Sequence, residues 1–357
     1  MNTADLTRLL SAVVDPYLGR PLGAAVRRVE IAGADAVAEV VLGYPVGRYA
    51  ATLTSQLAAA LARGGWTGGF KLELSAAIAA HGGPGTVQPL PGIGNVIAVA
   101  SGKGGVGKST VSANLALALA AAGARVGLLD ADIYGPSQPI MMGLTGRRPT
   151  TDDGKHLAPL EAYGVAVMSI GFLIDAEQPM VWRGPMVTQA LVQLIGDTRW
   201  GELDYLLIDM PPGTGDTQLT ISQRVPVSGA IIVTTPQDIA LADARKGLMM
   251  FRKVSVPVLG IVENMATHVC SNCGHEEHVF GEGGGRRMAE QYGVPLLGSL
   301  PLDIAIREQA DGGKPSVVAD PDGKVALAFL DIARRATARL ASGAAATAAP
   351  AISVSDD

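Results

Sequence analysis

The stretch VIAVASGKGGVGKST, residues 96–110, decides the fold of this chain. Its first five residues are apolar, which is typical of a buried strand, and Gly102 to Ser109 fits the pattern G-x-x-x-x-G-K-S/T. The glycines let backbone N–H groups surround phosphate oxygens without Cβ clashes. A helix expected over residues 108–122 points its positive end at the same phosphates. Strand, loop and helix together predict a nucleotide-binding loop.

Each side chain of this loop has an expected task. Lys108 reaches the β- and γ-phosphates, and Ser109 ligates Mg²⁺. The cofactor-binding residues predicted for the loop are Gly102, Lys103, Gly104, Gly105, Val106, Gly107, Lys108, Ser109 and Thr110. A guanine-specific Asn-Lys-x-Asp motif is absent, because the corresponding strand ends read TTPQD (234–238) and VENM (262–265). ATP is therefore the expected nucleotide.

Two acidic motifs follow apolar strands further along the chain. Strand RVGLLD leads into Asp130 and Asp132, and strand LDYLLID ends at Asp209. Acidic side chains at the carboxyl ends of parallel strands face the crevice where ligands bind. We expect Asp209 to hold Mg²⁺, directly or through water, and Asp132 to position or activate the attacking water. For Asp130, a structural cap at the strand end and a catalytic role are equally open.

The remaining pattern predicts an α/β fold, a doubly wound and mainly parallel sheet preceded by a small α+β domain. Unbroken apolar runs alternate with helical stretches, which is typical of a parallel sheet covered on both faces. The predicted strands are residues 96–100, 126–130, 165–170, 205–209, 230–234, 258–262 and 296–299, and the last helix covers residues 324–340.

Four segments are predicted. Residues 1–80 form the small domain, with a helix over 5–14, strands over 25–31 and 36–42, a helix over 49–63 and a strand over 70–74. Residues 81–94 are rich in glycine and proline and predict a linker. Residues 95–340 form the nucleotide-binding domain, and the Ala/Ser-rich tail 341–357 is expected to be disordered.

Composition limits the functional classes. The chain has 357 residues, of which 48% are hydrophobic and 17% charged, so a large core is expected and global disorder is not. The formal net charge of −5 gives no general attraction to nucleic acid or to anionic membranes. The start of the sequence contains no secretion signal and no run is long enough to span a bilayer, so we expect a cytoplasmic protein.

Cys270 and Cys273 are the only two cysteines, and they form a C-x-x-C pair. Two thiolates are two ligands, whereas tetrahedral zinc or a cubane iron–sulfur cluster takes four. A symmetric dimer supplies the other two, with the metal centre on the two-fold axis. Three interpretations stay open: a cluster bridging two subunits, a redox dithiol, and structural zinc. The zinc site would be closed by His275, His278 or His268.

A second lysine inside the loop, Lys103, makes SGKGGVGKST (101–110) a deviant Walker A sequence. This sequence resembles the group of MinD, ParA and the nitrogenase iron protein. In that group the early lysine crosses a dimer interface and touches the partner's phosphates, where a cation can neutralise charge in the transition state. The expected catalytic residues are Lys103, Lys108, Asp132 and Asp209.

Longer motifs narrow the resemblance. Over about residues 95–340 the chain is similar to the Mrp/ApbC family of iron–sulfur cluster carrier ATPases. The similarity lies in DADIYGPSQP (130–139), the run from 182 to 216, TTPQDIALADARKG (234–247) and ENMATHVCSNCGHEEHVFGEGGG (263–285). The resemblance implies slow ATP hydrolysis, homodimerisation, and a [4Fe-4S] cluster held by Cys270 and Cys273 of both subunits. It also implies delivery to apo-proteins and contact between Asn264 and the nucleotide base. Assembly of the cluster in place and its receipt from a scaffold protein both stay open.

The N-terminal motif VVDPYLGRPL (13–22) resembles the small MIP18-like (DUF59) domain that is often fused to these carriers. Many members carry a cysteine in the loop after the second strand, where this chain has Tyr44 in LGYPVGRY (42–49). A thiol-based role is therefore not expected, and docking of client proteins is our hypothesis for this domain.

Other classes of ATPase remain as alternatives. A MinD- or ParA-type positioning ATPase needs a basic or amphipathic terminal helix. The last helix carries Arg334, Arg335 and Arg339, but we expect it to pack on the sheet through Leu327, Leu330 and Leu340. A nitrogenase-type reductase has differently spaced cysteines. A zinc-stabilised ATPase without a cluster is the third alternative. No nucleic-acid or membrane partner is expected.

Overall fold

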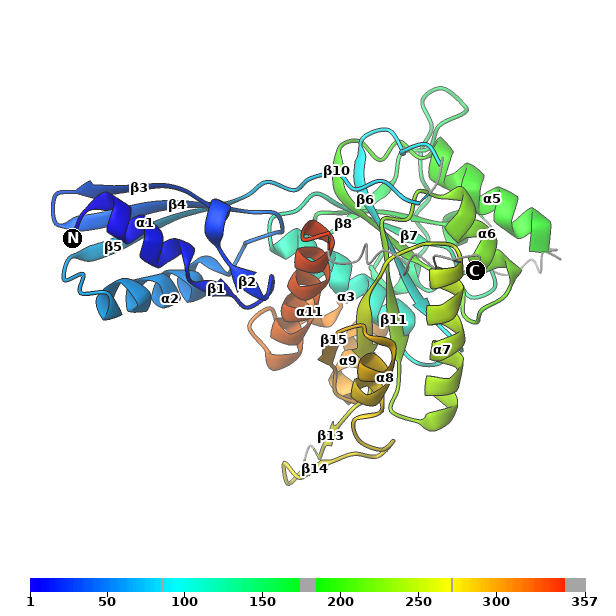
Figure 1. Cartoon of the computed structure of the whole chain (residues 1–357). Helices are drawn as coiled ribbons and strands as arrows, with labels where there is room; N and C mark the ends of the chain where they lie inside the picture. The colour runs from blue at the N-terminus through cyan, green and yellow to red at the C-terminus, as the bar shows by residue number, and fades with distance from the viewer. Residues whose placement is uncertain (85–86, 174–183, 271, 344–357) are drawn as a thin grey trace, which may run out of the picture.

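The computed structural model describes residues 1–84, 87–173, 184–270 and 272–343 of the chain (Figure 1). Most of the predicted tail lies outside these residues. The larger part of the molecule is built on an eight-stranded sheet in the order β15-β12-β11-β6-β10-β7-β9-β8. Its strands are β6 (Ile93–Ser101), β7 (Val126–Asp130), β8 (Leu160–Ala162), β9 (Val165–Ser169), β10 (Leu203–Asp209), β11 (Gly229–Thr234), β12 (Val258–Glu263) and β15 (Leu296–Ser299).

Every neighbouring pair in this sheet is parallel except β8 with β9. This pairing confirms the predicted mainly parallel α/β sheet. Strands such as β11 and β12 are buried along their whole length, as expected of a sheet covered on both faces. The strand β8 was not predicted from the sequence. It is a three-residue antiparallel edge strand, too short to show a periodic pattern.

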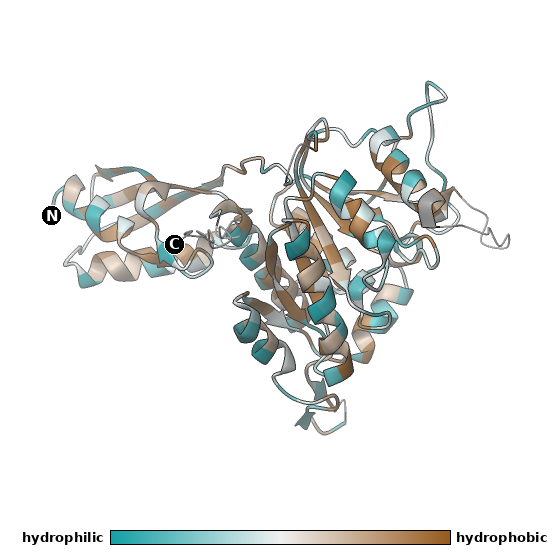
Figure 2. Ribbon diagram, turned by 45° about the vertical axis from the view of Figure 1, so that its right-hand side comes forward, coloured by the Kyte–Doolittle hydropathy of each residue, from teal (hydrophilic) through white to brown (hydrophobic). Residues whose placement is uncertain are grey.

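Helices cover both faces of the sheet (Figures 1 and 2). The helix α3 packs with α10 and α11 on one face, whereas α6, α7 and α8 lie on the other. The helical segments of this part are α3 (Lys108–Ala121), α4 (Gln138–Met141), η2 (Ile170–Phe172), α5 (Gly184–Asp197), α6 (Asp216–Arg224), α7 (Asp238–Lys253), α8 (Gly284–Tyr292), α9 (Ile304–Asp311), α10 (Ser316–Ala319) and α11 (Lys324–Ala341). None of the described helices combines the length and apolar character that crossing a membrane requires.

A second, smaller hydrophobic core belongs to the N-terminal part. Here β3 pairs antiparallel with β4, and β4 pairs parallel with β5, with α1 and α2 packed against the sheet. The elements are α1 (Thr3–Ser11), β1 (Val14–Asp15), β2 (Arg20–Pro21), η1 (Gly23–Ala25), β3 (Val26–Ala32), β4 (Asp35–Leu42), α2 (Ala50–Arg63) and β5 (Gly69–Ala76). The predicted order of the main elements is confirmed.

The first helix begins and ends earlier than residues 5–14, the range predicted from apolar periodicity. The side chain of Asn2 accepts a hydrogen bond from the backbone N–H of Asp5 at 2.9 Å, so the helix already begins at Thr3. It ends at Ser11, and Val14 belongs to the short strand β1. The N-cap residue therefore outweighs the apolar pattern that suggested a later start.

The helix α11 joins the two parts of the molecule. Arg334 on this helix is 8% exposed, and its guanidinium lies over the rings of Tyr17 and Tyr49 at 5.8 and 5.4 Å. It also donates a hydrogen bond to the carbonyl oxygen of Gly47 at 2.6 Å. Instead of facing solvent as a basic surface, this arginine ties the N-terminal part to the sheet domain.

One predicted packing contact of α11 is wrong. Leu330 and Leu340 are buried as expected, but Leu327 is 48% exposed. The buried stripe runs through Ala326 and Phe329, so Leu327 lies just beyond its edge.

Replacing Arg334 by methionine should loosen the N-terminal part from α11. The change removes two cation–π contacts and a charged hydrogen bond at a desolvated position, worth about 2 kcal/mol together. We expect faster proteolysis between the two parts and a lower thermal midpoint. Leu327→Ala on the same helix is the matched control and should change neither. Equal protease resistance of Arg334→Met and wild type would contradict the assigned contact.

Candidate functional site

The glycine-rich loop connects β6 to α3, as the sequence predicts. Gly105 and Gly107 have φ angles of +80° and +81°, which glycine adopts without strain. A Cβ atom on Gly102 would lie 2.1 Å from the backbone of Asp243, so close approach to α7 also requires glycine there. Gly107 directly precedes α3, whose first residue is Lys108. The loop and the helix N-terminus therefore present a run of backbone N–H groups, as a phosphate-binding loop needs.

Lys108 and Asp209 meet although they come from different elements. Their side chains, 6% and 0% exposed, form a buried ion pair between the N-terminus of α3 and the end of β10. Because β6, β7 and β10 are parallel neighbours, their carboxyl ends lie on one edge of the sheet. Lysine and carboxylate are the residue types that bind phosphate and Mg²⁺ in P-loop nucleotide sites, so this pair is a candidate for both.

Two further residues hold the Asp209 carboxylate, and neither was among the residues predicted from the sequence. The Ser112 hydroxyl donates to Oδ1 at 2.9 Å, and the Gln138 amide donates to Oδ2 at 2.9 Å. The same Gln138 nitrogen donates to the carbonyl oxygen of Ser109 at 3.0 Å. Ser112 had a sequence signal, since it lies one helical turn after Lys108, whereas the motif DADIYGPSQP does not show which carboxylate Gln138 contacts.

Asp130 serves the local structure. It is fully buried, and its carboxylate accepts hydrogen bonds from the backbone N–H groups of Asp132 and Gln138, at 3.1 and 3.0 Å, and from the Ser169 hydroxyl at 3.1 Å. Burial raises the pKa of Asp130, and the negative charge of Asp209 raises it further. Of the two roles left open by the sequence, these contacts favour the cap at the strand end.

The other predicted nucleotide residues lie around the same loop. Burial raises the pKa of the half-buried Asp132, and the charge of Lys108 opposes that shift, which places Asp132 within electrostatic range of the lysine. Asn264 is 8% exposed, and its amide donates to the carbonyl oxygen of Val106 at 2.9 Å. Lys103 is half-buried, and among the described residues its ammonium forms no ion pair. Asn264 therefore supports the loop backbone.

The two cysteines lie in the turn of a small hairpin formed by β13 (His268–Val269) and β14 (Glu276–Glu277). The backbone N–H of Cys270 donates to the carbonyl of His275 at 2.9 Å, and the N–H of Gly274 donates to the carbonyl of Cys270 at 2.8 Å. The hairpin projects from the body of the molecule (Figure 1). Cys273 is exposed and Cys270 is partly exposed, so both thiols are accessible to a second molecule.

The turn stabilises the thiolate form of Cys270. Backbone N–H groups of Cys273 and Asn272 hydrogen-bond its sulfur, with a further contribution from the Cys273 side chain, and together they lower the pKa of the Cys270 thiol. Thiolate is the form that binds metal. The backbone of the turn therefore favours the form of the Cys270 thiol that is able to bind metal.

Cys270 should react with iodoacetamide at a lower pH than an ordinary cysteine. Because its pKa is lowered, the thiolate fraction rises earlier as pH increases, and alkylation depends on the thiolate. The rate is measured by mass spectrometry of the labelled peptide from metal-free protein between pH 6 and about 9, with glutathione as reference. A midpoint at or above that of glutathione would argue against the thiolate-stabilising turn.

The histidines do not complete a metal site within the described part of one chain. Over residues 1–84, 87–173, 184–270 and 272–343, no group of three or more His, Cys, Asp or Glu side chains is placed to hold a metal ion. The Nδ1 atom of His268 hydrogen-bonds the Leu302 carbonyl at 3.1 Å, and that of His278 hydrogen-bonds the Ala266 carbonyl at 2.9 Å. Within the described residues, the cysteine pair therefore offers two thiol ligands and has no third one beside it.

The family model and two of the relatives that match this chain concern iron-transfer or iron-sulfur cluster carrier proteins. The family model described as the NUBPL iron-transfer P-loop NTPase, of the ParA type, matches residues 92–337. A protein of Pseudomonas fragi named iron-sulfur cluster carrier protein is 62% identical over 264 residues, which are 74% of this chain and 92% of that one. A Deinococcus radiodurans protein of the same name is 46% identical over 336 residues, 94% of each chain, so its similarity extends into the N-terminal part.

A solved structure is also similar. The nucleotide-binding protein of Archaeoglobus fulgidus in complex with ADP superposes with a TM-score of 0.57 and 41% identity. The superposition covers 65% of this chain and 90% of that one.

Proposed function

This chain belongs to the NUBPL family of iron-transfer P-loop NTPases and is an iron–sulfur cluster carrier, and from this premise we propose that it carries a [4Fe-4S] cluster between two copies of itself. In this proposal the cluster is cargo, which a scaffold protein supplies or which is assembled in place, and which the dimer passes to apo-proteins in the cytoplasm. ATP is the nucleotide, and its slow hydrolysis accompanies loading or release.

The observation that carries this proposal is the half-site on the hairpin. Cys270 and Cys273 are exposed enough to reach a second molecule, and the turn favours the thiolate of Cys270. A cubane cluster takes four cysteine ligands, and two hairpins related by a two-fold axis supply four. The zinc alternative closed by His275 or His278 has less support, because the described residues contain no third ligand beside the pair.

In the proposed nucleotide site, each predicted residue has a role in binding or hydrolysing ATP. Lys108 would neutralise the β- and γ-phosphates of ATP, while Ser109 and Asp209 would hold Mg²⁺. Gln138 bridges Ser109 and Asp209, so it would orient both magnesium ligands. Asp132 would position the attacking water, and Lys103 would reach the phosphates bound by the partner subunit. Because β6 and β12 belong to the same parallel sheet, the phosphate loop and the segment leading to the cysteines leave it at the same edge.

The deciding experiment is metal analysis of protein reconstituted without air, together with its mass in solution. We expect a brown dimer that contains iron and sulfide and shows a broad visible charge-transfer band. Multi-angle light scattering coupled to size exclusion gives the mass, and elemental analysis gives the metal content. A colourless, zinc-loaded protein with normal client activation would overturn the proposal, and so would a holo form that is monomeric.

For the N-terminal part, we propose a MIP18-like domain that docks client proteins. Tyr44 stands where many members of that family have cysteine, and its hydroxyl donates to the buried Asp15 carboxylate at 2.7 Å. Tyr49 donates to the same oxygen at 3.1 Å. Burial and this carboxylate raise the pKa of Tyr49, so the phenol stays a neutral donor. Because position 44 holds a structural tyrosine, a thiol-based role is not expected, and docking is the role that we propose. Client activation that survives deletion of residues 1–80 would disprove this proposal.

A further inference from the structure

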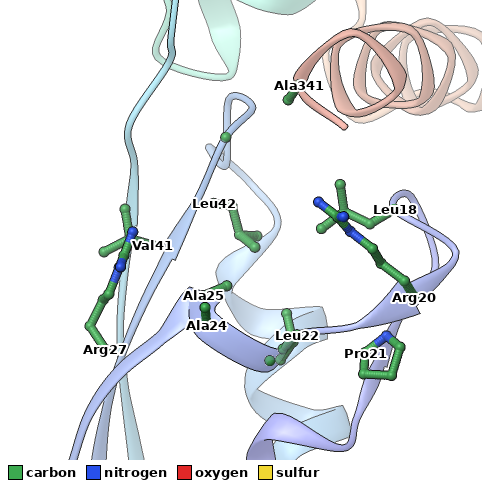
Figure 3. A pocket seen from close by; sticks show the side chains of 12 residues that line it. Leu18, Arg20, Pro21, Leu22, Ala24, Ala25, Arg27, Val41, Leu42 and Ala341 are labelled. Atoms are coloured by element: carbon green, nitrogen blue, oxygen red, sulfur yellow. The ribbon is translucent and has the colours of Figure 1, made fainter. Parts of the chain in front are cut away.

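A groove of about 370 Å³ lies on the N-terminal part beside the end of α11 (Figure 3). We call it the Arg20–Arg27 groove, after the two arginines among its lining residues. Arg20 comes from β2, Arg27 from β3, and Ala341 from the last turn of α11. In Figure 3 the two arginines lie on opposite sides of the hollow, with Leu22 and Leu42 between them.

The floor of the groove is aliphatic. Leu22 and Leu42 are 4% and 1% exposed, and Val41 adds a partly exposed apolar surface. None of the described residues that line the groove carries an aromatic ring on which a nucleic-acid base could stack. A ligand for this floor therefore needs a small aliphatic group.

Within the part of the chain that the structure describes, no carboxylate neutralises the charge at the rim. Arg20 and Arg27 are exposed, and neither forms an ion pair with a carboxylate among the described residues. The next residue on the same strand differs. Arg28 lies within 3.8, 3.7 and 3.5 Å of carboxylate oxygens of Glu30, Glu39 and Glu73. The strand thus holds one arginine whose charge is shared and one whose charge is available to a ligand.

A β-bulge places the available arginine. Val26 pairs with Val40 and Arg28 pairs with Glu39, so Arg27 is an extra residue without a partner on β4. Bulges bend a strand and change the direction of a side chain. The irregularity separates Arg27 from the carboxylates that surround Arg28, and it brings Arg27 to the groove.

We propose that the Arg20–Arg27 groove binds an acidic peptide segment of a protein partner. Carboxylates of the segment would pair with the two guanidinium groups, which match carboxylate geometry in a bidentate way. An aliphatic side chain between those carboxylates would lie on Leu22 and Leu42, where burial of apolar area adds affinity. A bare phosphate would leave this apolar floor uncovered.

This inference rests on the docking role proposed for the N-terminal part and gives it a surface and a ligand chemistry, but it does not depend on cluster transport. The groove lies on the N-terminal part, whereas the cysteine hairpin projects from the other part of the molecule (Figure 1). A partner held in the groove leaves both thiols accessible. Peptide binding and cluster loading are therefore separate measurements, and either can fail while the other succeeds.

The test uses the full chain and a fluorescein-labelled synthetic peptide in which leucines alternate with aspartates. Fluorescence anisotropy gives its affinity for wild type and for the double variant Arg20→Glu/Arg27→Glu. We expect saturable binding that weakens with salt, and a loss of affinity of at least about tenfold in the double variant. The double variant should keep its thermal midpoint and its cluster content, because both arginines are exposed.

Three comparisons make the result decisive. The control Arg28→Glu should change affinity by less than about twofold, because its charge is already shared with three glutamates. The same peptide with asparagine in place of aspartate should bind at least about tenfold more weakly. Inorganic phosphate and an oligouridylate should compete poorly. Absence of saturable binding, an equal loss in Arg28→Glu, or preference for phosphate or oligouridylate would overturn the proposal.

Discussion

Replacing Cys270 by serine should abolish the visible charge-transfer band of the anaerobically reconstituted protein, and Cys273→Ser should do the same. Each change leaves a dimer with two thiolates where a cubane cluster takes four. Iron and sulfide content should fall to the background of the apo-protein. Transfer to an apo-protein client should be lost with the cluster. The hairpin is exposed and makes few packing contacts, so the fold should stay intact.

Two controls locate the effect in the thiols. His275→Ala should keep the band, because His275 contacts Cys270 through its backbone carbonyl and not through its ring. ATP affinity of the cysteine variants should stay within about twofold of wild type, since distant sites act independently. A full band in either cysteine variant would exclude the two-fold cluster site. Loss of the band in His275→Ala would favour a ligand set that includes this histidine.

Replacing Lys108 by alanine should lower ATP hydrolysis by at least about a thousandfold, because the lysine is the main cation facing the β- and γ-phosphates. The same change leaves the fully buried Asp209 without its ion-pair partner, which costs about 3–5 kcal/mol. Hydrolysis is therefore measured at low temperature, on protein whose circular dichroism matches wild type. Nucleotide binding, followed by isothermal titration calorimetry, should be weakened as well.

Lys103→Ala is the matched variant for this experiment. Lys103 is half-buried and has no ion-pair partner among the described residues, so its loss should leave folding and ATP binding unchanged. If it acts on the phosphates of the partner subunit, it should slow hydrolysis without weakening binding. The double variant Lys108→Ala/Asp209→Asn removes the unpaired charge. Wild-type hydrolysis in that stable double variant would disprove the assigned role of Lys108.

The elements predicted well were those with a strong local signal. The strands β7 and β15 have the predicted bounds, because short apolar runs between turns identify buried parallel strands. The phosphate loop could also be predicted from the sequence, because its glycines and lysine stand at fixed spacing next to a strand and a helix. In these cases the residues that decide the structure are neighbours in the sequence.

The elements that were missed depend on contacts between distant segments. Gln138 reaches the Asp209 carboxylate across 71 positions of sequence, and nothing in its local pattern indicates that contact. The exposure of Leu327 and the burial of Arg334 depend on which face of α11 meets the N-terminal part. The bulge at Arg27 follows from the register of β3 on β4. Registers and helix orientations become visible only in three dimensions.

The contact between Gly47 and the end of α3 has a mechanical consequence. The backbone N–H of Gly47 donates to the carbonyl of Ala122 at 2.9 Å, and a Cβ on Gly47 would lie 2.7 Å from the backbone of Ala122. The first residue of that helix is Lys108. Close-packed interiors have low compressibility and transmit strain, so a displacement at the phosphate-facing end of α3 would be felt at Gly47. The helix α3 therefore connects the phosphate loop physically to the N-terminal part.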